Sequence, residues 1–236
     1  MPERDRPLYA VLIDADNIPA KYAEAILKEI TSFGEPALRR VYGDWGSTRL
    51  NTWARAVRDL GLVAHQETAN TTGKNASDIG LVIDAMDILH SGRFDGFVLV
   101  SSDSDFTSLA NRVREQGMDV IGIGEAKAPE SLRNVCNRFI LLENIIDEPA
   151  PTEKGAPTPA KQNPTQAIPL ILKAMDKINA EDEWYALGQL GQYITRDNPD
   201  FDPRTYGKKK LSDLVQALKR FETRKIGNQL HARRVD

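Results

Sequence analysis

Short apolar runs alternate with amphipathic stretches of helix length from about residue 8 to residue 142. The runs at 8–13 (LYAVLI) and 96–100 (GFVLV) are apolar throughout, as strands that are covered on both faces of a parallel sheet require. Strands that alternate with helices pair through right-handed crossovers, so we expect a doubly wound α/β fold with a parallel sheet flanked by helices. The expected strands lie at residues 8–13, 37–42, 62–65, 96–100, 119–123 and 139–142, and the expected helices at 20–33, 48–60, 77–90, 106–116 and 129–135.

Glycines mark the expected ends of four helices, at Gly34, Gly61, Gly92 and Gly117. A helix commonly ends on a residue with a left-handed backbone, which glycine adopts without a steric penalty. We therefore expect a left-handed conformation at all four positions.

The segment 147–164 divides the chain, because it is rich in Pro, Ala and Thr and has no hydrophobic period. Such a segment cannot bury apolar surface and is predicted to be a flexible linker between domains at 1–146 and 165–236. In the second domain we expect helices at 167–178, 184–195 and 209–220, then a hairpin that turns at Gly227 and Asn228. Three helices and a hairpin predict a small winged helix-turn-helix domain.

Cysteine and histidine are scarce, which restricts the kind of metal site the chain can build. Cys136 is the single cysteine, and the three histidines are far apart in sequence. A zinc site of several thiolates is therefore excluded, and any metal must be bound by oxygen. The sequence has neither an apolar run of about 20 residues nor the hydrophobic region of a signal peptide, so we expect a cytoplasmic protein without a membrane partner.

Acidic side chains follow two expected strands and open one expected helix. The first strand runs into DADN, the fourth into SSDSDF, and KNASD enters the third helix. Ligands of open α/β sheets bind at the carboxyl ends of the strands, so these segments are expected to meet at one edge. The candidate catalytic and metal-binding residues are Asp14, Asp78, Asp103 and Asp105, with Asn17 and Ser101 as groups that orient the carboxylates.

Several carboxylates held close together repel one another unless a cation neutralises them. Oxygen ligands suit Mg²⁺ or Mn²⁺, which can polarise a phosphate and activate a bound water. The competing interpretation is helix capping, which fits Asp78 and Asp105 individually but neither Asp14 nor Asp103. Further along the third helix, Asp84 and Asp87 are expected to be structural, and Asp44 is a candidate for the rim of the site.

The runs LIDADN, KNASDIGLVIDAMDIL and FVLVSSDSDFTSLANRVREQGMDVIGIG resemble the NYN domains of the PIN-like nuclease superfamily over residues 7–142. The resemblance implies a PIN-like, Rossmannoid parallel sheet and a Mg²⁺- or Mn²⁺-dependent ribonuclease. The family's first-strand Asp and its Asn fall on Asp14 and Asn17, and its helix-start Asp falls on Asp78. Its SxDxDF motif falls on Ser101, Asp103 and Asp105.

The later run WYALGQLGQYITRDNPDFDPRTYGKKKLSDLVQAL resembles the LOTUS (OST-HTH) winged-helix domain. That resemblance implies RNA binding and, in some members, contacts with proteins. NYN and LOTUS domains recur together, so the two resemblances support each other.

The two halves of the chain differ in charge. Residues 1–148 carry 16 Lys and Arg against 23 Asp and Glu, whereas residues 161–236 carry 14 against 10. Basic clusters bind phosphate backbones through counterion release, so the second half is expected to bind nucleic acid. Tyr206 and Phe221 could stack on unpaired bases, although a core position is the favoured interpretation of Phe221. The candidate RNA-binding residues are Lys208, Lys209, Lys210, Arg220, Arg224 and Lys225 in this half and Lys74 in the first, with Arg49 and Arg55 as weaker candidates.

The sequence therefore predicts a metal-dependent endoribonuclease that acts on single-stranded or loop regions of RNA and captures it with its C-terminal module. A non-catalytic RNA-binding adaptor of the same fold is the main alternative. A phosphatase with a DxD pair after its first strand is a further one, for which Asp14 and Asp16 have the right spacing. A protein partner for the LOTUS-like module and a homodimer also stay open.

Overall fold

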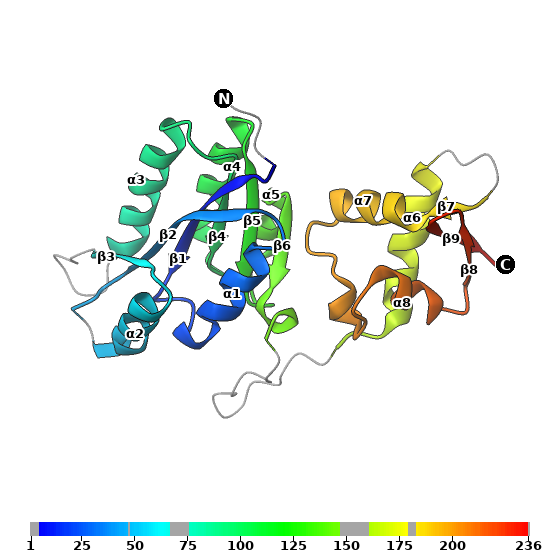
Figure 1. The fold of residues 1–236 in the computed structure, drawn as a ribbon, viewed down its shortest axis with the longest axis horizontal. Helices are drawn as coiled ribbons and strands as arrows, with labels where there is room; N and C mark the ends of the chain where they lie inside the picture. Colours follow the sequence, from blue (N-terminus) through cyan, green and yellow to red (C-terminus); the bar gives the residue numbers. More distant parts are fainter. Residues whose placement is uncertain (1–4, 47, 67–75, 147–160, 179–182, 236) are drawn as a thin grey trace. The chain divides into compact units, whose positions relative to one another are not determined.

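The computed structural model describes residues 5–46, 48–66, 76–146, 161–178 and 183–235. The chain divides into two compact units, Met1–Ala150 and Pro151–Asp236 (Figure 1). Each unit has a hydrophobic core of its own. In the part of the chain that is described, no helix is both long and apolar enough to cross a bilayer.

The first unit is built on a six-stranded parallel sheet with the strand order β3-β2-β1-β4-β5-β6 (Figure 1). This confirms the predicted parallel α/β fold. All six expected strands form, with bounds within about two residues of those predicted. They are β1 (Leu8–Asp14), β2 (Glu35–Gly43), β3 (Val63–Gln66), β4 (Gly96–Val100), β5 (Asp119–Gly124) and β6 (Arg138–Leu141).

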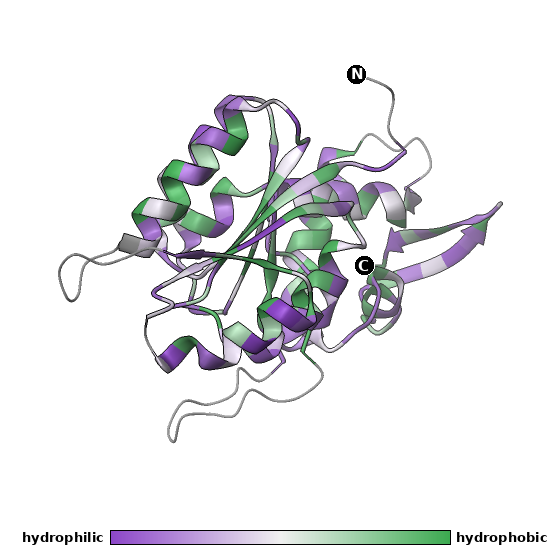
Figure 2. Ribbon diagram, turned by 60° about the vertical axis from the view of Figure 1, so that its left-hand side comes forward, coloured by the Kyte–Doolittle hydropathy of each residue, from purple (hydrophilic) through white to green (hydrophobic). Residues whose placement is uncertain are grey.

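Helices cover both faces of this sheet, because successive side chains of each strand point to opposite faces. In β1, Val11 and Ile13 belong to one buried cluster, with side chains of α1 (Ala23–Ile30) and α2 (Asn51–Asp59). Leu12 belongs to the opposite cluster, with side chains of α3 (Ala76–His90), α4 (Thr107–Glu115) and α5 (Glu130–Val135). Figure 2 shows the result, with hydrophobic residues on the inner sides of the helices. Short 3₁₀ turns precede three of these helices, η1 (Ala20–Tyr22), η2 (Thr48–Leu50) and η3 (Ser104–Phe106), and a fourth, η4 (Leu142–Asn144), follows β6.

The strand order reverses direction between β1 and β4. The chain moves outward from β1 through β2 to β3, then crosses back to place β4 on the other side of β1. The place where the strand order reverses is called the switch point of the sheet. The loops that follow the two strands there run to opposite faces, and the crevice between them, at the carboxyl ends of the strands, is where ligands of this fold class bind. The ends of β1 and β4 are in register there, with Ile13 paired to Val100.

The glycine predictions are correct at three positions and wrong at the fourth. Gly61, Gly92 and Gly117 have φ of 62°, 61° and 76°, the left-handed backbone expected after a helix. Gly34 does not have a positive φ. A Cβ there would lie 2.5 Å from the carbonyl oxygen of Pro7 and 2.6 Å from the ring of Tyr9. Gly34 is therefore needed for close packing against the start of β1.

The second unit combines helices with a three-stranded antiparallel sheet in the order β7-β9-β8. The hairpin turns at Gly227 and Asn228, as predicted, and the winged helix-turn-helix prediction is confirmed. The elements are η5 (Pro164–Ala167), α6 (Ile168–Lys177), β7 (Tyr185–Ala186), α7 (Leu187–Asp197), η6 (Pro203–Tyr206), α8 (Leu211–Gln216), β8 (Phe221–Ile226) and β9 (Gln229–Arg234).

Two predicted helices of this unit are shorter than expected. The helix expected from residue 184 begins only at Leu187, because Tyr185 and Ala186 pair with β9 as strand β7. The helix expected at 209–220 covers only Leu211–Gln216, because Lys210 has an extended backbone and the chain turns after Ala217 to enter β8.

Candidate functional site

Asp14 is the last residue of β1, and its carboxylate accepts hydrogen bonds from the turns that follow β1 and β4. Oδ1 accepts hydrogen bonds from the backbone N–H groups of Asp16 (3.1 Å) and Asn17 (3.2 Å). Oδ2 accepts a hydrogen bond of 2.9 Å from Oγ of Ser101, the residue that follows β4. Asp14 is only 4% exposed. Its position is therefore set by the turns that leave two adjacent strands.

A second set of hydrogen bonds links those two turns. The side-chain oxygen of Asn17 accepts from the backbone N–H of Ser102 at 3.2 Å. Oγ of Ser101 accepts from the N–H of Asp103 at 3.1 Å, so Ser101 contacts the backbone of one acidic residue and the carboxylate of another. Asn17 thus orients the turn after β4, whereas Ser101 contacts a carboxylate directly.

Asp103 caps the short helix η3, which the sequence interpretation did not expect. Its Oδ1 accepts a hydrogen bond of 2.9 Å from the N–H of Asp105. Capping satisfies an N–H group that has no partner within the helix and occupies one carboxylate oxygen. The carboxylate of Asp105, which was the expected cap, is exposed.

Asp78 lies in the first turn of α3, and its electrostatics place it near the other carboxylates. Burial raises the pKa of Asp78 above its usual value, and the negative charges of Asp103, Asp16 and Asp105 raise it further. Repulsion of this kind requires the charges to be close together. Hydrogen bonds from Ser77 to Asp16 and from Ser101 to Asp14 also connect the three segments, which therefore bring acidic side chains to one edge of the sheet.

The same causes act on Asp14. Its pKa is raised to about 6, chiefly by burial and also by the charges of Asp78 and Asp16. The hydrogen bonds from Ser101 and from the backbone of Asn17 lower the pKa but do not compensate. The protein therefore keeps a carboxyl group at the end of β1 in surroundings that disfavour its charged form.

Asp16 also belongs to the site, although it was not among the predicted catalytic residues. Its Oδ2 accepts a hydrogen bond of 3.0 Å from Oγ of Ser77, and Oδ1 lies 3.5 Å from the guanidinium of Arg49. Asp16 thus connects the turn after β1 to α3 and to η2. The spacing of two aspartates around Ala15, directly after a buried strand, was the signal in the sequence that could have identified it.

The chemistry of these donors fits a hard divalent cation. The edge offers carboxylate, amide and hydroxyl oxygens, and repulsion among the carboxylates favours a bound positive charge. Within the described residues, no Lys or Arg forms an ion pair with Asp14, Asp78, Asp103 or Asp105. In that same part of the chain, however, no three His, Cys, Asp or Glu side chains are grouped closely enough to hold a metal ion. Mg²⁺ usually keeps several waters and needs only one or two carboxylates, so the donors present still fit such an ion.

Other residues named from the sequence lie outside this cluster. Asp84 contacts Arg40 and the hydroxyl of Tyr42, which gives it the structural role expected. Asp44 accepts a hydrogen bond of 3.2 Å from the N–H of Gly46 and so shapes its own turn. Lys74 falls outside the described residues.

The basic residues of the second unit lie on its surface. Lys209, Lys210, Arg220, Arg224 and Lys225 are exposed, and Lys208 is partly exposed. They occupy the segment before α8, the end of the turn before β8, and β8 itself.

The core position favoured for Phe221 is confirmed, whereas the suggestion that Tyr206 stacks on bases is wrong. Tyr206 and Phe221 are 8% and 7% exposed and belong to the hydrophobic core. The aromatic ring that does lie among basic groups is Trp184, which the sequence interpretation missed. The guanidinium carbons of Arg224 and Arg233 lie 4.1 Å and 4.9 Å from its ring centroid. The two arginines are far from Trp184 in sequence and reach it only through the pairing of β7, β9 and β8.

Comparison with known protein families gives two matches. The model of the NYN domain matches residues 9–143, and that of the OST-HTH/LOTUS domain matches residues 159–231. A search of curated proteins found no match.

Among solved structures, the chain is similar to a protein of unknown function from Vibrio parahaemolyticus, with 20% identity and a TM-score of 0.51. That match covers 62% of this chain and 98% of the other, and it supports the fold alone. An uncharacterised protein from Nitrosomonas europaea is 31% identical over 38% of this chain and 90% of its own, with a TM-score of 0.27.

Proposed function

The chain belongs to the NYN domain family, within the PIN-like nuclease superfamily, and a LOTUS domain follows the NYN domain in the sequence. We therefore propose that the protein is a metal-dependent endoribonuclease. The observation that supports the proposal is the hydrogen-bonded connection of three acidic segments at one edge of the sheet. Ser101 links the buried Asp14 to the backbone of Asp103, and Asp16 links the same turn to Ser77, next to Asp78 at the start of α3. Burial and repulsion among the carboxylates raise the pKa values of Asp14 and Asp78. A site that only capped helices would not need a buried carboxylate at the end of β1.

Asp14, Asp103 and Asp105 would hold Mg²⁺ or Mn²⁺, with Ser101 orienting Asp14, while Asp78 would either bind the ion as well or orient the attacking water. A bound ion neutralises charge on the phosphate and lowers the pKa of a coordinated water. Asp103 keeps one oxygen available while the other caps η3, and Asp105 extends from an exposed position next to it.

The reaction we propose is hydrolysis of an RNA phosphodiester. Water adds to the phosphorus atom, and the bond from phosphorus to the leaving oxygen breaks. Asp78 is the best candidate to orient this water and accept its proton, because its side chain is partly exposed at the start of α3. The proton needed by the leaving oxygen comes from solvent.

Cleavage of labelled RNA by purified variants in Mn²⁺ or Mg²⁺ tests this proposal. Asp14→Asn and Asp78→Asn should each reduce cleavage by more than about 100-fold, because each change removes a carboxylate that binds the cation or orients the water. Asp87→Asn is the matched control, since Asp87 is exposed on the same helix as Asp78 and lies outside the cluster. Equal cleavage by the wild type and the Asp14 variant would contradict the assignment.

One observation favours a second candidate function, a non-catalytic RNA-binding adaptor. The described residues contain no ready-made group of metal ligands, so the fold and its acidic edge could persist without turnover. An adaptor would bind RNA through the basic surface of the LOTUS domain and leave it intact in every divalent cation tested. Cleavage that depends on Mn²⁺ and on Asp14 would exclude this alternative.

A further inference from the structure

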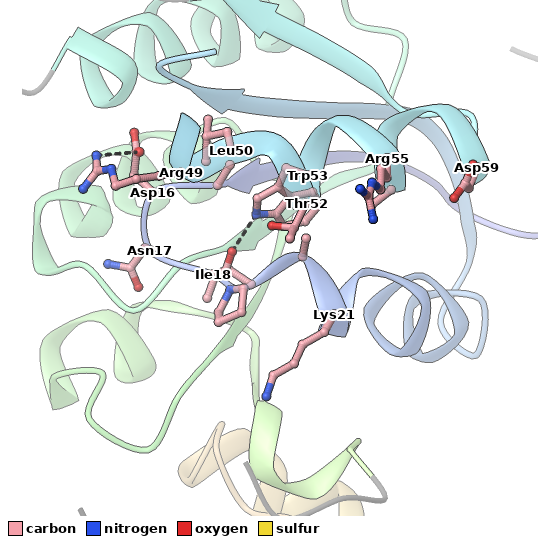
Figure 3. Close-up of a pocket in the computed structure, with 14 residues that line it drawn as sticks. Asp16, Asn17, Ile18, Lys21, Arg49, Leu50, Thr52, Trp53, Arg55 and Asp59 are labelled. Carbon is pink, nitrogen blue, oxygen red and sulfur yellow. Dashed lines mark hydrogen bonds and ion pairs between the residues drawn. The ribbon is translucent and has the colours of Figure 1, made fainter. Parts of the chain in front are cut away.

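A hollow of about 610 Å³ opens beside the acidic cluster, between the turn after β1 and helix α2 (Figure 3). Asp16 and Asn17 line one end of it, and Asp59 lies toward the other end. The backbone N–H of Asn17 is one of the donors to Asp14, so the hollow and the acidic edge share a wall. A molecule seated in the hollow would therefore lie next to any phosphate at that edge.

The wall of the hollow combines apolar side chains with cations. Pro19, Ala20 and Ala56 provide the accessible apolar surface, with the buried Ile18, Leu50 and Trp53 beneath it. Arg49 and Arg55 add positive charge from the turn before α2 and from α2 itself. Residues 49, 52, 53 and 56 follow the spacing of a single helix face, which explains why they line the same space. Apolar surface bordered by guanidinium groups suits a nucleotide, whose base is flat and whose phosphate is anionic.

The hollow is held in shape by buried contacts. Trp53 is 1% exposed, and its indole N–H donates a hydrogen bond of 2.7 Å to the carbonyl oxygen of Ile18 (Figure 3). Gly43 lets Leu50 and Ala15, two residues of the lining, pack closely against the end of β2. A Cβ at this position would lie 2.6 Å from a methyl carbon of Leu50 and 3.3 Å from Cβ of Ala15. A wall with a fixed shape reduces the conformational entropy that is lost when a ligand binds.

We infer that this hollow binds an unpaired nucleotide of the RNA strand next to the cleaved phosphodiester. The inference rests on the proposed function, which supplies RNA as the substrate. The base would lie against the apolar wall, with Arg55 facing a neighbouring phosphate. The volume falls within the ~300–1,000 Å³ of small-ligand sites. A base in a duplex is stacked and paired and cannot enter such a site, so the hollow selects single strands and loops.

Binding is tested on the full chain in EDTA, where metal-dependent cleavage cannot occur. A uridine trinucleotide is titrated while the indole N–H signals of the three tryptophans are followed by NMR. The signal of Trp53 should shift and saturate, because its ring lines the hollow. Trp45 donates to the carbonyl oxygen of His65 and is absent from the lining, so its signal is the internal reference.

Two arginines of α2 give a matched pair of variants. Arg55→Ala should weaken the binding reported by Trp53 about three- to tenfold, as loss of one phosphate contact predicts. Arg58→Ala makes the same change of charge three residues away, outside the lining, and should leave the affinity within about twofold. Thr52→Trp, at an exposed position that lines the hollow, should fill it and abolish the shift.

Three outcomes would overturn the inference. The first is a Trp53 signal that stays in place while that of Trp184 shifts, since the strand would then bind only to the second unit. The second is an equal response to inorganic phosphate, which would leave an anion site without base recognition. The third is equal weakening by Arg55→Ala and Arg58→Ala. A saturable Trp53 shift in a protein that cleaves no RNA would instead retain the nucleotide site and reject only the nuclease.

Discussion

Asp14 is a residue whose ionised side chain opposes the stability of the fold. Its carboxylate is almost fully buried at the end of β1, and the hydrogen bonds it receives do not offset burial and the charges of Asp78 and Asp16. A group whose pKa is higher in the folded state than in the unfolded state binds more protons when folded. Its contribution to stability therefore falls as the pH rises from about 4 to about 6.

Asp14→Asn should remove this dependence on pH. In EDTA, the free energy of unfolding of the variant should gain about 2–3 kcal/mol relative to that of the wild type between pH 4 and pH 7, because one pKa unit corresponds to about 1.4 kcal/mol. Urea unfolding at several pH values measures the difference. The exposed Asp87→Asn variant should follow the wild type throughout. Parallel curves for the wild type and Asp14→Asn would show that the carboxyl group is not perturbed.

At the scale of elements, the site depends on a close contact between the end of β5 and the turn after β4. Gly124 ends β5, and a Cβ there would lie 2.5 Å from the carbonyl oxygen of Ser101 and 3.0 Å from Oγ of Ser102. Oγ of Ser102 in turn accepts a hydrogen bond of 2.8 Å from the N–H of Glu125. Only glycine lets these segments approach so closely.

Gly124→Ala should therefore affect both stability and catalysis. Overpacking of this kind costs about 1–3 kcal/mol, and the displaced Ser101 would no longer hold Asp14. Thermal unfolding and the RNA cleavage assay measure the two effects. Gly46→Ala is the comparison within the same unit, since among the described residues its methyl group would meet only the flexible carboxylate of Asp44, at 3.3 Å. An unchanged melting temperature together with full cleavage would contradict the role given to this contact.

The elements that could be predicted from sequence are those whose signals are local. The apolar strands, the acidic residues that follow them and the hairpin at Gly227 each have a pattern within a few residues. Strand β7 has none, because Tyr185 and Ala186 become extended only by pairing with Ala232 and His231, more than 40 residues later.

The predictions that failed at single residues also depended on distant partners. Gly34 has the spacing of a helix cap, but its role is set by Pro7 and Tyr9. Tyr206 stands next to a run of lysines in the sequence, yet its ring packs near that of Phe201, with centroids 5.9 Å apart. The hollow beside α2 likewise needs the turn after β1 and could not be inferred from either segment alone.

At the scale of the whole molecule, the proposed function would give the acidic first unit and the basic second unit complementary tasks. Net negative charge around the acidic edge repels RNA, so capture must come from elsewhere or from bound metal. The exposed lysines and arginines of the LOTUS domain can supply it, because each contact with a phosphate releases a counterion. Binding of a single strand should therefore weaken steeply with salt.

Lysine variants of the full chain test whether the second unit supplies this attraction. Removing Lys209, Lys210 and Lys225 together should reduce the slope of log affinity against log salt by about 0.7 for each phosphate contact that is lost from a single strand. Lys173→Ala is the control, because Lys173 lies 4.0 Å from Asp197 in an ion pair and its charge is already partly neutralised. Fluorescence anisotropy in EDTA at several salt concentrations gives the slopes. A triple variant with the slope of the wild type would place the contacts with RNA elsewhere, and it would leave the LOTUS domain free for a protein partner.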